Sequence, residues 1–102
     1  MIAGCGIKHV AVIWLKDPSS VGTLERAVQE LATIPHVQGI AAGPPLATDW
    51  GRAIDTSYHY AFVAGFKTID DCRAYFECDL HRRVAAEIAE LAERVHAVYV
   101  SY

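Results

Sequence analysis

Residues 58–84 read YHYAFVAGFKTIDDCRAYFECDLHRRV, and this stretch decides the fold that the rest of the chain completes. Its first part, 58–66, places aromatic and small apolar residues at every second position, which predicts a strand with one strongly apolar face. Thr68 and Asp71 are spaced like the two ends of a capping box and predict the start of a short helix. A break is expected near Asp79, which can cap a second helix. We therefore expect a strand followed by two helical segments.

The segments on either side supply the remaining strands and helices. Ile7 to Lys16 predicts a strand with two apolar faces, and Pro18 precedes a helix with apolar residues at steps of three and four. Further strands are expected at 37–43 and 96–102, with an amphipathic helix over 84–95. The order is β-α-β-β-α-β. It predicts an α+β, ferredoxin-like protomer with a four-stranded antiparallel sheet.

In the β-α-β-β-α-β order the helices lie on one face of the sheet and leave the other face bare. On the first strand, one face carries His9 together with four apolar residues: Ile7, Ala11, Ile13 and Leu15. The other face carries Val10, Val12 and Trp14, which would be bare in a monomer. The chain is also 53% hydrophobic, which is a high value for a domain of this size. We therefore predict a homodimer formed through the open sheet face.

Length, charge and cysteine content narrow the class of protein. With 102 residues, the chain is expected to form one domain spanning 1–102. A net charge of −3 without a basic cluster argues against nucleic acid and membrane surfaces as partners. The three cysteines form no C-x-x-C pair, so reduced thiols in a cytoplasmic protein are expected. The histidines are scattered without close ligand spacing, so neither a metal site nor another cofactor is expected.

Tyr75 and His81 are the candidate catalytic residues. Histidine and tyrosine can act as a proton-transfer pair near neutral pH. Six residues apart on an unbroken helix, they would differ by about 240° and point to different faces. The predicted break at residues 78–80 is therefore necessary for the two side chains to meet. A structural role is the alternative, in which Tyr75 packs beneath its helix and His81 pairs locally.

Several separated motifs resemble the stress-responsive A/B barrel (Dabb) family, over roughly residues 7–102. They are Lys8-His9-Val10, the passage Leu31…Ile34-Pro35-His36-Val37…Gly43, the strand Tyr60-Ala61-Phe62-Val63, and Tyr75…His81. The last of these is similar to the family's Tyr-x-x-His-Pro-x-His stretch, with Cys78-Asp79 in place of His-Pro. The resemblance implies a dimeric α+β barrel. In members of the olivetolic acid cyclase type it also implies cofactor-free aldol chemistry.

That resemblance assigns roles to individual residues. It implies that His81 is a general base, that Tyr75 is its hydrogen-bonding partner, and that His9 lines the pocket and orients substrate.

The connection at 46–56 is long for a compact domain. Its Trp50 and Arg52 are predicted to bind substrate as part of a closing flap, or else to serve as a loop anchor and a solvated charge.

The sequence leaves four functions open. The leading prediction is an apolar pocket that binds a small aromatic or keto-bearing metabolite. The first alternative is a cofactor-free polyketide cyclase or lyase that uses the Tyr75–His81 pair. The second is a non-catalytic stress-response protein with a filled core around Tyr75. A cofactor-free monooxygenase of the same architecture ranks last, because nothing in the pocket residues points to oxygen chemistry.

Overall fold

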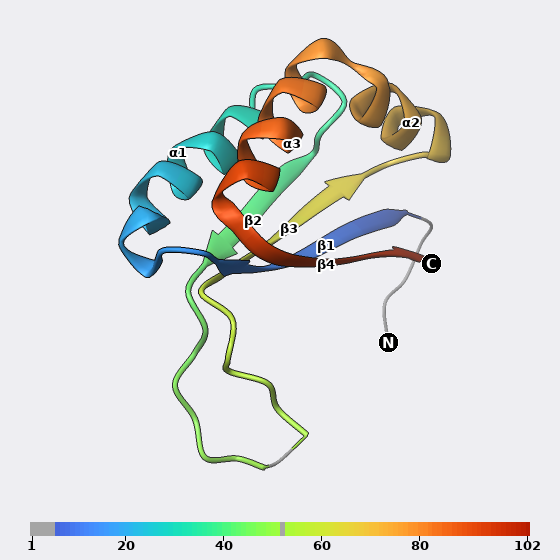
Figure 1. Ribbon diagram of the computed structural model, residues 1–102. Helices are drawn as coiled ribbons and strands as arrows, with labels where there is room; N and C mark the ends of the chain where they lie inside the picture. Colours follow the sequence, from blue (N-terminus) through green and yellow to red (C-terminus); the bar gives the residue numbers. More distant parts are fainter. Residues whose placement is uncertain (1–5, 52) are drawn as a thin grey trace.

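The computed structural model describes residues 6–51 and 53–102 (Figure 1). The elements follow one another as β1 (Ile7–Leu15), a 3₁₀ turn η1 (Pro18–Ser20), α1 (Val21–Leu31), β2 (Gly39–Gly43), β3 (Tyr60–Phe66), α2 (Ile69–Glu77), α3 (Asp79–Leu91) and β4 (Ala92–Ser101). The strands form one antiparallel sheet in the order β2-β3-β1-β4. The helices lie together on one face of it (Figure 1). This confirms the predicted ferredoxin-like α+β fold.

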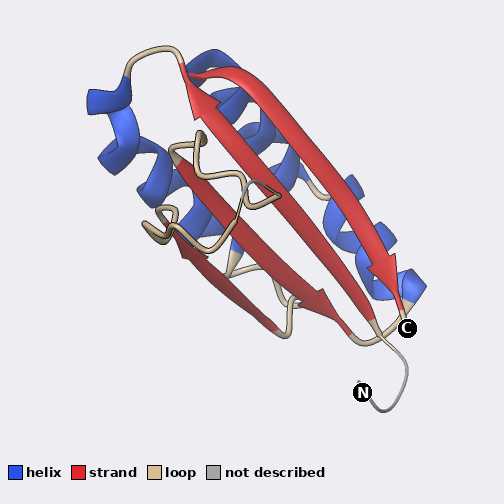
Figure 2. Cartoon of the chain, turned by 90° about the horizontal axis from the view of Figure 1, so that it is seen from below, coloured by secondary structure: helices blue, strands red, loops and turns tan. Residues whose placement is uncertain are grey.

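The central strand β1 separates the two faces of the sheet as its alternation predicted. Its odd-numbered residues from Ile7 to Leu15 are buried under the helices, and the residues between them are only half-buried. On the helix-covered face, Phe62 and Phe66 of β3 pack into the core with Leu24 of α1. The opposite face of the sheet has no helix over it (Figure 2). The histidine at position 9 therefore belongs to the inner layer.

Helix α1 begins at Val21, directly after the 3₁₀ turn at Pro18–Ser20. The side chain of Asp17 accepts a hydrogen bond from the Ser19 backbone N–H at 3.0 Å and starts the short turn that leads into the helix. The helix ends at Leu31, and Ile34 stays buried although it lies in the following turn. An ion pair between Arg83 and Glu30, with an N–O distance of 2.6 Å, joins α1 to α3.

The junction between α2 and α3 differs in one detail from its prediction. The Thr68 hydroxyl caps α2 by accepting the Asp71 N–H at 3.1 Å, as expected. The cap of α3, however, is Cys78, whose sulfur accepts the His81 N–H at 3.4 Å, whereas Asp79 is already the first helical residue. Cys78 has an extended backbone (φ −73°, ψ 153°), so the chain changes direction between the two helices.

Strand β4 begins four residues before the predicted position. Val95 continues the spacing of the apolar positions in α3, and for this reason the sequence placed it on the helix. In the structure the helix ends at Leu91, and Val95 lies in β4 opposite Ile13 of β1. The pairing of β1 with β4 runs from Ile7 opposite Ser101 to Trp14 opposite Arg94, and its register shifts before Leu15 pairs with Ala92. This pairing outweighs the helical pattern, because it satisfies backbone polar groups on the side of β4 that faces β1.

Residues 44–59 form a long connection between β2 and β3, which we call the arm. It extends from the sheet on the side away from the helices, and it lies in front of the strands in Figure 2. At its base, the Trp14 indole N–H donates to the Ser57 hydroxyl at 3.0 Å, and the Arg94 guanidinium stacks over the Trp14 ring at 4.6 Å.

Within the described residues, no helix is long and apolar enough to cross a membrane.

Candidate functional site

Three of the five residues that the sequence selected for a pocket meet between the sheet and the helices. His9 comes from the middle of β1, Tyr75 from the end of α2 and His81 from the start of α3. The ring centroids of Tyr75 and His81 are 4.6 Å apart, and those of His9 and Tyr75 are 6.1 Å apart. The change of direction at Cys78 places Tyr75 and His81 on the same side despite their spacing of six residues.

Two polar atoms of this cluster lack hydrogen-bond partners. The Tyr75 side chain is completely buried, at 0% exposure, and His9 is 7% exposed. Among the described residues, neither the Tyr75 hydroxyl nor His9 Nδ1 has a hydrogen-bond partner. A buried polar group without a partner costs about 1–3 kcal/mol. Such groups are uncommon in native proteins, and this pair marks the cluster as a place where a polar ligand atom would be stabilising.

Burial adjusts the acid–base properties of the cluster in opposite directions. Desolvation, together with the neighbouring His81, lowers the pKa of His9 to about 4. Desolvation also lowers the pKa of His81, and an interaction with the backbone of Phe76 opposes this change in part. The same burial raises the pKa of Tyr75 well above its usual range. At neutral pH the cluster therefore holds two neutral imidazoles, which can accept a proton, and one phenol, which can only donate a hydrogen bond.

A cavity of about 160 Å³ lies next to the two histidines. Its walls come from β1, β4, α1, α3 and one residue of β3, and they are apolar apart from His9 and His81. Ile13 and Val95 contribute on the sheet side and Ile88 on the helix side. Tyr75 is not among the described side chains that line this cavity, so it acts on the space only through its neighbours.

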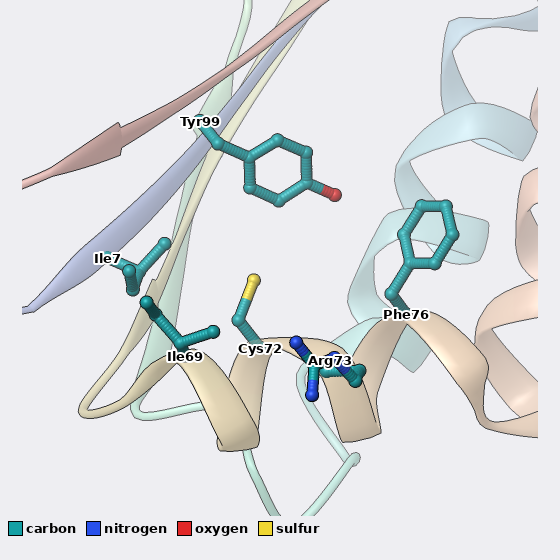
Figure 3. Close-up of a pocket in the computed structure, with 6 residues that line it drawn as sticks. All are labelled: Ile7, Ile69, Cys72, Arg73, Phe76 and Tyr99. Carbon is teal, nitrogen blue, oxygen red and sulfur yellow. The ribbon is translucent and has the colours of Figure 1, made fainter.

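A second and larger cavity, of about 390 Å³, lies toward the start of β1 and α2. Figure 3 shows the side chains that line it: Ile7, Ile69, Cys72, Arg73, Phe76 and Tyr99. Sequence reasoning missed Tyr99, which lies directly opposite His9 in the pairing of β1 with β4. Alternation along β4 could have suggested that Tyr99 faces the helices. Its partner in β1, however, depends on a strand register that the sequence does not reveal.

The remaining predicted site residues lie elsewhere. Trp50 is in the arm, 75% exposed, and the arm is on the opposite side of the sheet from both cavities (Figure 1). Trp50 therefore does not contribute to a pocket of its own chain. Arg52, the other predicted flap residue, lies outside the described residues. Within 6–51 and 53–102, no group of three His, Cys, Asp or Glu side chains is placed to hold a metal ion.

The fold and the enclosed His–Tyr cluster define a ferredoxin-like α+β protein with a pocket between its sheet and its helices. A family model described as Stress responsive A/B Barrel Domain (Dabb) matches residues 7–101. The chain therefore belongs to the stress-responsive A/B barrel, or Dabb, family. A search of curated protein sequences gives no match.

Solved structures agree with this assignment. A dimeric ferredoxin-like protein of unknown function from Thermobifida fusca YX is 30% identical, with a TM-score of 0.76, and the match covers 100% of this chain and 95% of that one. A Dabb family protein from Mesorhizobium loti is 18% identical, with a TM-score of 0.73 and coverage of 95% and 96%. Hydroxynitrile lyase from Passiflora edulis is 16% identical, with a TM-score of 0.75 and coverage of 95% and 93%, and this likeness shows the fold alone.

The buried histidines predict a loss of stability in mild acid. The pKa of His9 is about 4 in the folded protein, against 6.5 when exposed, so the unfolded chain takes up the proton first as the pH falls. The stabilisation is thus complete above about pH 6.5 and decreases toward pH 4, with His81 acting in the same direction. For His9 alone the largest loss is roughly 3 kcal/mol.

Urea unfolding at a series of pH values would measure this loss. A His9→Leu variant is expected to show a clearly smaller slope of unfolding free energy against pH. Identical slopes for the variant and the wild type would contradict the assignment of the effect to His9.

Proposed function

We propose that this protein binds a small, partly aromatic or keto-bearing metabolite in the cavity beside His9 and His81. The observation that carries the proposal is His9 Nδ1, a buried atom without a hydrogen-bond partner among the described residues, on a side chain that lines a cavity whose walls are apolar apart from His9 and His81. A ligand with an apolar body and one or two oxygen atoms would fill the space and supply a missing hydrogen bond. Small-molecule sites in proteins combine these two features.

The residues around the cavity support this ligand chemistry. His9 contacts Phe62 edge to face, with ring centroids 5.3 Å apart, and Phe76 lies 5.1 Å from His81. Aromatic neighbours favour a flat ligand, because rings pack edge to face or in offset stacks. The neutral imidazoles disfavour a strongly anionic ligand, since no positive charge is available to compensate it.

A second candidate function is cofactor-free acid–base catalysis at the same site. The closeness of Tyr75 and His81, with pKa values moved in opposite directions, favours it. A neutral His81 can remove a proton from the carbon next to a carbonyl. Tyr75, which does not line the cavity, would orient His81 as a hydrogen-bond donor. In Passiflora edulis the same fold carries a hydroxynitrile lyase.

We also propose that two copies pack through their open sheet faces to form a dimeric α+β barrel. Val98 and Val100 of β4 and Val63 of β3 are exposed on this face in the single chain. A second copy would remove them from water, and the dimeric state of the Thermobifida fusca relative supports this arrangement. Because the arm extends from the same face, Trp50 would lie against the partner copy and could act as a flap only there.

One experiment tests both candidate functions, with 4-hydroxyacetophenone as the probe. His81→Ala is expected to weaken binding of the probe about tenfold, which corresponds to about one lost hydrogen bond. Arg82→Ala is the matched control, because Arg82 is the next residue on α3 and points to solvent. Titration calorimetry measures both. If His81→Ala binds the probe as tightly as the wild type does, the ligand site is assigned wrongly.

The same samples test for catalysis. Exchange of the probe's methyl protons in D₂O, followed by NMR, reports proton removal from carbon. Catalysis requires that the wild type accelerate this exchange, and that His81→Ala lose about a hundredfold of the acceleration. Binding without any acceleration would leave the protein as a binder and would exclude His81 as a general base toward this class of ketone.

A further inference from the structure

Tyr99 stands between the two cavities. Its ring stacks on His9, with centroids 4.5 Å apart and an angle of only 3° between the planes. His9 lines the smaller cavity, whereas Tyr99 lines the larger one. The stacked pair therefore separates the smaller cavity from the larger one, which is open to solvent along α2, where Ile69 and Phe76 are exposed. Figure 3 shows the Tyr99 hydroxyl directed toward the side of Phe76, with the Cys72 sulfur pointing from α2 toward the Tyr99 ring.

The two rings of this partition differ in how firmly they are held. His9 is in the second-to-edge strand and is buried between β3 and β4. Tyr99 is on the edge strand β4 and is 46% exposed. Exposed side chains change rotamer within picoseconds to nanoseconds, whereas buried ones are held by close packing. Of the two, Tyr99 is the ring that can move aside.

The larger cavity has the properties of a compartment for a flat apolar group. Phe76 and Tyr99 provide aromatic surfaces on two sides, and the remaining described walls are apolar except for Arg73. The Arg73 guanidinium is already near a carboxylate, with Asp70 at 3.9 Å. A planar aromatic ring that replaces Tyr99 on the face of His9 would preserve the stacking that the movement removes.

We propose that the larger cavity is a second binding compartment for a planar aromatic ring, and that Tyr99 determines whether a ligand held at His9 and His81 can extend into it. The inference rests on the proposed ligand site and adds the ligand class and the residue that sets ligand length. With Tyr99 stacked, the site accepts a single ring. With Tyr99 displaced, the two cavities join past His9 and accept a ligand of two linked rings.

The test compares phenol, a single-ring probe, with 4-phenylphenol, which adds a second ring in line. Tyr99→Ala is expected to bind 4-phenylphenol at least tenfold more tightly than the wild type does, while its affinity for phenol changes less than threefold. Tyr99→Trp is expected to weaken 4-phenylphenol selectively, because a larger ring blocks the opening. Tyr99→Phe keeps the partition and should retain the wild-type preference. Thermal unfolding confirms that each variant is folded.

Val95→Ala is the matched control. Val95 is on the same face of β4 but lines only the smaller cavity, so its truncation should not change the ratio of the two affinities. If Tyr99→Ala shows the wild-type ratio while phenol still binds, the partition is wrong and the proposed ligand site stands. If neither probe binds the wild type or Tyr99→Ala, the proposed ligand site itself fails, and the second compartment fails with it.

Discussion

Val10→Asp is expected to abolish the proposed dimer and leave the protein as a monomer. Val10 lies on the open face of the central strand, directly between Val63 of β3 and Val98 of β4. In a face-to-face dimer the substitution would bury one unpaired carboxylate from each copy, at a cost of about 3–5 kcal/mol each. The dissociation constant should therefore rise by at least about a thousandfold. Sedimentation velocity over a range of protein concentrations would measure the change.

Ile69→Asp provides the control for this prediction. Ile69 is, like Val10, a β-branched apolar residue, and it is exposed on α2 within the helical layer. Its substitution changes the net charge by the same amount and should leave the association state as it is. A Val10→Asp protein that remains dimeric at micromolar concentration would show that the open sheet face is not the interface.

Two substitutions of Tyr75 should have opposite effects on stability. Tyr75→Ala removes a completely buried ring that packs against Phe66 at a centroid distance of 4.7 Å, so it should lower the free energy of unfolding by about 3–5 kcal/mol. Tyr75→Phe keeps the ring and removes only the hydroxyl that has no partner. We expect it to raise the free energy of unfolding by about 1 kcal/mol in the absence of ligand.

Urea unfolding at a fixed protein concentration would compare the two variants, because the stability of the proposed dimer would depend on concentration. Ligand binding should reverse the order. If the Tyr75 hydroxyl helps to hold His81 for a bound ketone, Tyr75→Phe would be more stable than the wild type when free but would gain less stability from the ligand. A Tyr75→Phe protein that is less stable than the wild type when free would mean that the hydroxyl has a partner in the native state.

Much of the fold could be predicted because its strands alternate in a simple way. Along β1, burial follows the predicted two-residue period from Ile7 to Leu15 without exception. The start of β4 could not be predicted in this way. Val95 fits a helical stripe and a strand equally well, and only the pairing with Ile13 decides between them. That pairing joins residues far apart in the sequence, so a local pattern does not contain it.

In the candidate site, too, the residues placed by local sequence patterns could be predicted, whereas those placed by contacts between distant segments could not. Tyr75 and His81 are near each other in the sequence, and the expected break between the helices was enough to place them together. His9 joins them because strand alternation directs it inward. Tyr99 was missed because its position depends on the register of two strands. Trp50 was expected at the pocket, but the direction in which the arm leaves the sheet was not evident from its composition.

The cap at Cys78 has a consequence for how the site can vary. A thiol is a weaker hydrogen-bond acceptor than a hydroxyl or a carboxylate, so the N-cap hydrogen bond that starts α3 is comparatively weak. Tyr75 precedes Cys78 on α2, and His81 follows it on α3. The distance between the two side chains therefore depends on the junction between two helices rather than on a single rigid helix. Substitution of Cys78 alone can therefore change the distance between the two rings, while the sheet beneath them stays the same.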